Sequence, residues 1–184
     1  SMKGHFLLEI GWIRDAERQF KLALSIKPND PYAHFGLGLV YSQLKHYEES
    51  INHYDLAIEY GGENWVALPF SYSNKANSLF GLNKYGEAMK CLDKAIELDP
   101  NYPIPYYTRG VHYYYKLFDF ENAIKFLSKA IELNPLYSEA LTLRAEAYQQ
   151  IGEYRNSEED LERARKLFGF SPLRKISISL EDRI

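Results

Sequence analysis

Small side chains recur along the chain at a nearly constant spacing. One alanine returns at intervals of 34, 38, 35 and 34 residues, and another small residue stands seven positions before each of these alanines. A third small residue lies a further 12 or 13 positions upstream. A period of this length indicates an internal repeat. The five sets are Gly4, Ala16 and Ala23; Gly38, Ser50 and Ala57; Ala76, Ala88 and Ala95; Gly110, Ala123 and Ala130; and Ala145, Ser157 and Ala164.

Each repeat also contains two stretches in which apolar residues lie three or four positions apart, which is the period of an amphipathic helix. In the second repeat, Leu37 and Tyr41 belong to the first stretch, and Ile51 and Tyr54 belong to the second. A short polar segment, residues 45–48, separates the two stretches. The small residues would let neighbouring helices approach closely while larger side chains fill the space around them. The pattern therefore predicts an all-α protein built from pairs of helices.

The order of these positions resembles the W-x2-L-G-x2-Y…A-x3-F…A…P pattern of the tetratricopeptide repeat. The resemblance covers about residues 3–170. It implies a tetratricopeptide-type α-α superhelix, which is a right-handed solenoid of antiparallel helix pairs, with a C-terminal capping helix. The matching positions are His34, Leu37, Gly38, Tyr41, Ser50, Tyr54 and Ala57; Tyr72, Lys75, Ala76, Leu79, Ala88, Leu92, Ala95 and Pro100; Tyr106, Arg109, Gly110, Tyr113, Ala123, Leu127, Ala130 and Pro135; and Leu141, Arg144, Ala145, Tyr148, Ser157, Leu161 and Ala164.

We expect the repeat array to occupy residues 1–170. The first unit matches only in part, because the start of its first helix is missing. The units would lie at about 1–30, 31–64, 69–102, 103–137 and 138–170.

Residues 171–184 follow the predicted array and allow two interpretations. As a strand, Ile176 and Ile178 would alternate with serines. As a helix, Ser171 would be the N-cap and Pro172 the first helical residue. We favour the helix, because a solenoid leaves its last helix pair uncovered and a terminal helix would cap it.

Two irregularities interrupt the repeat. Four extra residues fall between the second and third units, in the segment 61–68, where Gly61 and Gly62 replace the usual proline at the helix end. We expect a longer loop there, with Trp65 packed back as its anchor; the alternative is that Trp65 is a contact for a partner. One extra residue lies within 111–120 of the fourth unit and predicts a local π-bulge.

Composition and charge narrow the function. The chain of 184 residues carries a net charge of −3 and one cysteine. These values argue against a basic nucleic-acid surface, a polybasic membrane patch and a disulfide-stapled secreted scaffold. No apolar run approaches the roughly 20 residues of a transmembrane helix. We therefore expect a cytoplasmic protein without membrane insertion.

Catalytic or metal-binding chemistry is not indicated. His46, Glu49 and His53 lie near one another in the sequence but do not match the spacing of a zinc site, so we interpret them as surface or packing residues. Cys91 is expected in the core. The glycines occur singly rather than as a phosphate-binding loop. We expect no enzyme activity, no cofactor and no metal.

The resemblance implies that the first helix of each unit lines the concave side of the superhelix, where a partner binds. The residues carried over to this surface are rich in aromatic and apolar side chains, which favour interaction sites. We predict a groove for an apolar peptide or helix segment of a partner protein. Its residues are Tyr32, Phe35, Leu39, Phe70, Asn74, Asn77, Phe80, Tyr107, Val111, Tyr114, Thr142 and Glu146.

Tetratricopeptide co-chaperones hold the C-terminal carboxylate of Hsp70 or Hsp90 with lysine, arginine and asparagine. Asn74 and Asn77 fall at such positions here, but Phe35, Ile104 and Glu139 stand where other clamp contacts would be needed. A carboxylate against apolar side chains loses hydration without compensation. We therefore expect no capture of a chaperone tail.

The function predicted from the sequence is that of a protein-interaction scaffold or adaptor. Two alternatives remain at this point. The chain could associate with itself, as a homo-oligomer or as part of a longer solenoid, through the open face of its partial first unit. It could also be a targeting module of a larger enzyme.

Overall fold

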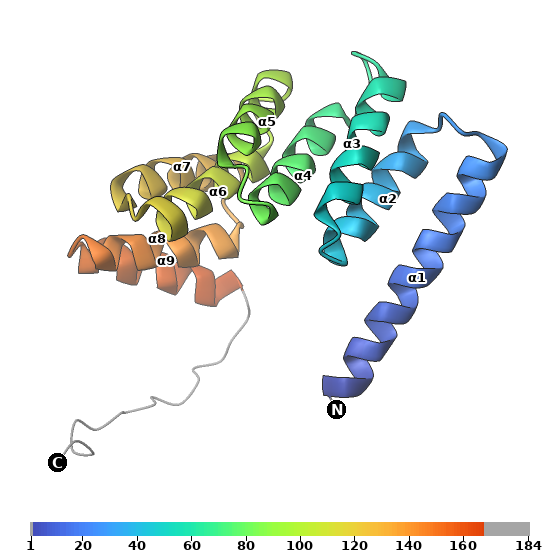
Figure 1. Cartoon of the computed structure of the whole chain (residues 1–184). Coiled ribbons are helices and arrows are strands. Elements are labelled where there is room, and N and C mark those ends of the chain that lie inside the picture. Colours follow the sequence, from blue (N-terminus) through green and yellow to red (C-terminus); the bar gives the residue numbers. More distant parts are fainter. Residues whose placement is uncertain (1, 168–184) are drawn as a thin grey trace.

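The computed structural model describes the backbone of residues 2–167 and the side chains of residues 12–167. Within this part of the chain every regular element is a helix. Figure 1 shows the helices stacked in chain order from α1 to α9 as an all-α helical solenoid. The elements are α1 (Met2–Ile26), α2 (Pro31–Gln43), α3 (Tyr47–Gly61), α4 (Leu68–Gly81), α5 (Tyr85–Leu98), α6 (Pro103–His112), the π-helix η1 (Tyr113–Leu117), α7 (Phe120–Leu133), α8 (Ser138–Gln150) and α9 (Tyr154–Leu167).

The helices pack as four consecutive pairs, α2 with α3, α4 with α5, α6 with α7, and α8 with α9. The second helix of each of the first three pairs also packs against the first helix of the next pair. A chain of such contacts between neighbours is the architecture of a helical solenoid. No helix in the described part of the chain is both long and apolar enough to cross a membrane.

The recurring small residues lie where helices meet. In the units from α2 onward, Ala57, Ala95 and Ala130 are fully buried. A Cβ atom added at Gly38 would lie 2.5 Å from the ring of Tyr54, so the absence of a side chain lets the tyrosine pack on the helix backbone. The small positions therefore set the distance between helices, as the sequence pattern predicted.

The first unit differs from the expected pair of helices. Residues 2–26 form one continuous helix, α1, and there is no turn between two helices in this unit. No proline interrupts this segment, and a continuous helix satisfies its internal backbone hydrogen bonds without a turn. In α1 the equivalent alanines, Ala16 and Ala23, are only half-buried, because α2 covers α1 on one side.

The insertion between the second and third units has the predicted form. Gly62 caps α3 with φ 71°, and the loop continues to the start of α4 at Leu68. Trp65 is 8% exposed and packs flat on the backbone of Gly61, where an added Cβ would lie 2.4 Å from the indole ring. Trp65 is thus the anchor of the loop, and its burial leaves little surface for a partner.

The π-bulge predicted in the fourth unit is also present. It is η1, which follows α6 directly and takes up the extra residue. The turn closes with the N–H of Asp119 donating to the carbonyl oxygen of Tyr113 at 3.1 Å. Asp119 then accepts the N–H of Asn122 at 3.0 Å with its side chain and caps α7. The predicted capping helix at 171–184 lies outside the described residues.

The turn after η1 stores backbone strain. Phe118 has φ 52° and ψ 31°, a left-handed conformation that costs a bulky side chain roughly 1–2 kcal/mol. The corresponding turns place Lys45, Asn83 and Gly152 in left-handed conformations. Phe118 is 71% exposed, so little packing offsets the strain.

Phe118→Asn is expected to raise the free energy of unfolding by about 1 kcal/mol, measured by urea denaturation. The exposed neighbour Leu117 serves as control, since Leu117→Asn relieves no strain and should leave the free energy of unfolding nearly unchanged. A Phe118→Asn variant that is less stable than wild type would show that the left-handed conformation of Phe118 is not strained.

Polar contacts join successive units at one recurring position. In the units from α2 onward, the residue before the small residue of the first helix is a cation in three of four cases, Lys75, Arg109 and Arg144. Lys75 pairs with Asp55, and Arg109 pairs with Asp93, each on the second helix of the preceding unit. Both carboxylates are largely exposed.

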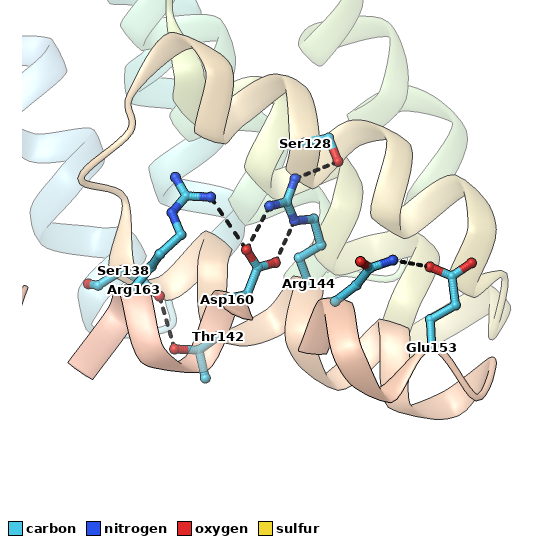
Figure 2. A network of polar contacts seen from close by, with 8 residues as sticks. Ser128, Ser138, Thr142, Arg144, Glu153, Asp160 and Arg163 are labelled. Atoms are coloured by element: carbon cyan, nitrogen blue, oxygen red, sulfur yellow. Dashed lines mark hydrogen bonds and ion pairs between the residues drawn. The ribbon is translucent and has the colours of Figure 1, made fainter. Parts of the chain in front are cut away.

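The third cation is held differently. The position equivalent to Asp55 and Asp93 is Ser128, whose hydroxyl oxygen accepts a bond of 2.8 Å from Arg144. The carboxylate comes from Asp160 in α9, which accepts two bonds of 2.7 Å from the guanidinium group. The side chains of Arg144 and Asp160 are 14% and 4% exposed, and Arg163 also approaches Asp160. This buried network ties together α7, α8 and α9 (Figure 2).

Candidate functional site

The residues predicted to bind a partner lie on the first helices of four units. Tyr32, Phe35 and Leu39 belong to α2, and the next four belong to α4. Tyr107 and Val111 lie on α6 and Tyr114 on η1, and the last two lie on α8. The face formed by α2, α4, α6, η1 and α8 is therefore the candidate site.

On α2 the aromatic side chains of this face pack around the loop anchor. The ring of Tyr32 meets that of Trp65 edge-on at a centroid distance of 5.4 Å, and Phe35 meets it at 6.2 Å. Phe35 is half-buried, whereas Tyr32 is 55% exposed and Leu39 is 42% exposed. This end of the face thus keeps exposed apolar surface next to a packed core.

On α4 the side chains of Asn74 and Asn77, both predicted to contact a partner, differ in whether they are free to bind one. The Asn74 side chain donates a bond of 2.8 Å to the carbonyl oxygen of Phe70, within its own helix. Asn77 is exposed and lines a hollow between α4 and α6. Phe70 lies edge-on to Tyr102 at 4.7 Å and remains 39% exposed. Asn77 is therefore the amide that faces an open space.

The hollow between α4 and α6 is almost wholly apolar, and we call it the apolar hollow. Its volume is about 180 Å³. Phe80 stacks on the buried imidazole of His112 at 4.9 Å, and Tyr85 packs on the same imidazole at 5.1 Å and on Phe80 at 6.2 Å. Burial, and secondarily the charge of Lys116, lowers the pKa of His112, which favours its neutral form. The lining residues are Asn77, Phe80, Tyr85, Thr108, Val111, His112, Tyr115 and Lys116.

A second hollow lies between α6 and α8 and contains carboxylates, so we call it the acidic hollow. Its volume is about 270 Å³. Tyr107 forms one wall and packs on Tyr137 at a centroid distance of 4.8 Å. Burial, followed by the charges of Glu139 and Glu146, raises the pKa of Tyr107. The lining residues are Tyr107, Val111, Tyr115, Ser138, Glu139, Thr142, Leu143 and Glu146.

The two hollows adjoin, because Val111 and Tyr115 line both of them. Tyr114 is among the residues predicted for this face, and Tyr115 is not. In the structure Tyr114 packs on Phe120 at 5.4 Å, whereas Tyr115 is 55% exposed and faces the hollows. Tyr115 is therefore a lining residue in addition to the predicted ones, and Tyr114 lies near Glu146: burial, followed by the charge of Glu146, raises the pKa of Tyr114. The extra residue is visible in the sequence, but the exposure of Tyr115 between the two hollows is not.

The histidines of the second unit form packing contacts. His53 faces His34, with 3.0 Å between their Nδ1 atoms, and Nε2 of His34 lies 3.0 Å from the carbonyl oxygen of Pro28. Because that carbonyl can only accept, Nε2 of His34 donates to it, and the two Nδ1 atoms share one hydrogen bond whose direction depends on the tautomers of the rings. Burial lowers the pKa of His53. Within the described part of the chain, no group of three or more His, Cys, Asp or Glu residues is placed to hold a metal ion.

Comparisons with known proteins agree with this architecture. Models described as tetratricopeptide repeat match residues 31–64, 105–135 and 138–167, and a model described as TPR repeat matches residues 76–116. A TPR repeat-containing protein of Methanocaldococcus jannaschii is 31% identical over 126 residues, which is 65% of this chain. The matched region spans about a fifth (22%) of the length of that relative.

Solved structures share the fold. Pseudomonas aeruginosa PilF superimposes with a TM-score of 0.74 at 19% identity, covering 94% of this chain and 75% of the other. The second TPR of Spaghetti (RPAP3), bound to the HSP90 peptide SRMEEVD, gives a TM-score of 0.51 at 27% identity, covering 54% of this chain and 92% of the other. Sequence pattern, helix pairing and comparisons lead to the same conclusion: the chain belongs to the tetratricopeptide repeat family.

Proposed function

We propose that this chain is a non-enzymatic protein-interaction scaffold that holds an apolar peptide or helix segment of a partner against the face of its first helices. The observation that carries the proposal is the continuity of the apolar and acidic hollows through Val111 and Tyr115. Each hollow is smaller than the roughly 300–1,000 Å³ of small-molecule sites. Two small adjoining hollows suit successive side chains of a peptide better than one compact ligand.

The family supports a partner of this kind. Tetratricopeptide repeats are typically protein-interaction modules, and the RPAP3 domain binds a peptide. That peptide, SRMEEVD, contains three acidic side chains. Here the acidic hollow presents Glu139 and Glu146, which would repel such a sequence. The proposed partner segment therefore differs from a chaperone tail.

The proposal is tested by placing a charge in the shared wall. A phage-displayed library of random 12-residue peptides is selected on the wild-type chain, and affinities of enriched peptides are measured by fluorescence anisotropy. Val111→Glu is expected to weaken binding by at least about tenfold, because a carboxylate would enter both hollows and lose hydration against a bound apolar side chain. Phe80→Ala and Tyr107→Ala should also weaken binding.

A matched control separates a local effect from a general one. Leu117 is exposed and lines neither hollow, so Leu117→Glu adds the same charge elsewhere on η1 and should leave affinity unchanged. Circular dichroism monitors folding of each variant. Peptides that bind wild type and Val111→Glu equally well would place the binding surface elsewhere and refute the proposal.

Self-association is a second candidate, favoured by a specific surface. Trp12 is 69% exposed on α1, and Leu22 and Ile26 on the same helix are 56% and 81% exposed. A hollow of about 350 Å³ also lies between α1 and α2, lined by Trp12, Ile13, Ala16, Val40 and Gln43. Light scattering over a dilution series tests this candidate, since a mass that stays that of one chain at all concentrations would exclude it.

A further inference from the structure

The carboxylates of the acidic hollow lack a counter-ion within the described part of the chain. Neither Glu139 nor Glu146 has an ion pair there. The hydroxyl of Ser138 donates a bond of 2.9 Å to Glu139. The Thr142 hydroxyl donates to the carbonyl oxygen of Ser138, so its proton is used inside α8 (Figure 2). Two negative charges thus border the hollow, and an apolar ligand alone would leave these charges uncompensated.

The pKa values of the surrounding tyrosines are consistent with this negative field. Burial, followed by the charge of Glu146, raises the pKa of Tyr114. Tyr107, in the wall of the hollow, is affected by both Glu139 and Glu146. A cation entering the hollow would meet two carboxylates, which attract positive charge, in a wall that also contains Tyr107 and Tyr115.

The neighbouring apolar hollow has the opposite preference. Phe80, Tyr85 and Val111 line it together with the buried His112, whose lowered pKa favours the neutral form. Lys116 also lines this hollow. A cationic side chain would therefore be repelled here, whereas an aliphatic or aromatic side chain would bury apolar surface. The two hollows thus favour different side chains.

We infer that the partner segment carries a bulky apolar side chain for the apolar hollow and, about three residues away, a lysine or arginine for the acidic hollow. This inference rests on the proposed function of the face. The spacing follows from geometry, because neighbouring helices lie about 8–10 Å apart and an extended peptide advances about 3.3 Å per residue. This chain would thus recognise one apolar and one basic side chain of its partner, whereas the peptide bound by RPAP3 is acidic.

Three phage-displayed libraries test the inference. Each contains 12-residue peptides with a central Leu, Ile, Met or Phe, and a residue three positions away that is Arg in one library, Gln in the second and Glu in the third. Both orders of the pair are included. The libraries are selected in parallel on the wild-type chain. We expect the Arg library to yield at least about tenfold more enriched clones than the Glu library, with the Gln library between them.

Charge-neutral variants identify the source of the preference. The best Arg peptides should bind Glu139→Gln/Glu146→Gln about tenfold more weakly than wild type. The control is Glu121→Gln/Glu158→Gln, which changes the net charge equally at exposed positions outside both hollows and should retain the affinity. Raising salt from 50 to 500 mM should weaken the Arg peptides and leave the Gln peptides nearly unchanged.

The outcomes separate the inference from the proposed function. Equal enrichment from the three libraries, with binding still lost in Val111→Glu, would overturn the apolar–basic preference and leave the peptide-binding face intact. The same holds if the Glu library wins. Enrichment that neither Val111→Glu nor Phe80→Ala reduces, or no enrichment from any library, would overturn both.

Discussion

Replacing Asp160 by alanine is expected to lower the free energy of unfolding by about 3–5 kcal/mol. The substitution removes the carboxylate that accepts both bonds from Arg144 and leaves a guanidinium group whose side chain is 14% exposed without an anion. The hydroxyl of Ser128 remains as an acceptor, but it carries no charge. Urea denaturation followed by circular dichroism measures the loss.

A control with the same chemistry but different burial is present in the chain. Arg109 pairs with Asp93, whose side chain is 65% exposed. Asp93→Ala should cost less than about 1 kcal/mol, because an exposed ion pair contributes little. A second test is Arg144→Met/Asp160→Leu, which should recover most of the stability lost in Asp160→Ala. Equal losses for Asp160→Ala and Asp93→Ala would show that burial of the network does not determine its effect.

Gly110 and Leu127 should show strong energetic coupling. A Cβ at Gly110 would lie 2.7 Å from Cγ of Leu127, which is fully buried. Gly110→Ala is therefore expected to cost about 1–3 kcal/mol through overpacking, and Leu127→Ala about 2–5 kcal/mol through the cavity it leaves. In the double variant the new methyl group occupies space vacated by leucine. Its cost should fall below the sum of the single costs by about 0.5–3 kcal/mol in urea denaturation.

Gly86 provides the control for this cycle. It lies in the first turn of α5, and a Cβ there would have no neighbour within 4 Å. Gly86→Ala should therefore stabilise the protein by several tenths of a kcal/mol to about 1 kcal/mol, because alanine restricts the unfolded chain. Additive costs at Gly110 and Leu127 would contradict the view that the small repeat positions set the distance between helices.

Local patterns in the sequence were enough to predict much of the architecture. The helix pairs followed from the 3–4-residue spacing, and the burial of Ala95 and Ala130 followed from their places in the repeat. The π-bulge followed from one extra residue, and the packing of Trp65 on Gly61 followed from an insertion with two glycines. These features depend on residues close together in the chain, which is why the sequence predicts them.

Other features depend on how distant elements meet. Tyr115 of η1 lines both hollows, and this depends on how α4, α6 and α8 are placed around it. The proposed peptide preference came into view only with the residues that surround these hollows.

The amino-acid sequence by itself determined the family, the helix pairs, the positions of the small residues and the two irregularities. The repeat period did not reveal the continuity of α1, which is itself a local property. The tertiary structure alone decided that Arg144 takes its carboxylate from Asp160 and that Tyr115 lies between two hollows of different character. The physical reason is one of range: helix formation and repeat spacing are set by neighbours in the chain, whereas side-chain pairing depends on the rotation and distance of helices that meet only after folding.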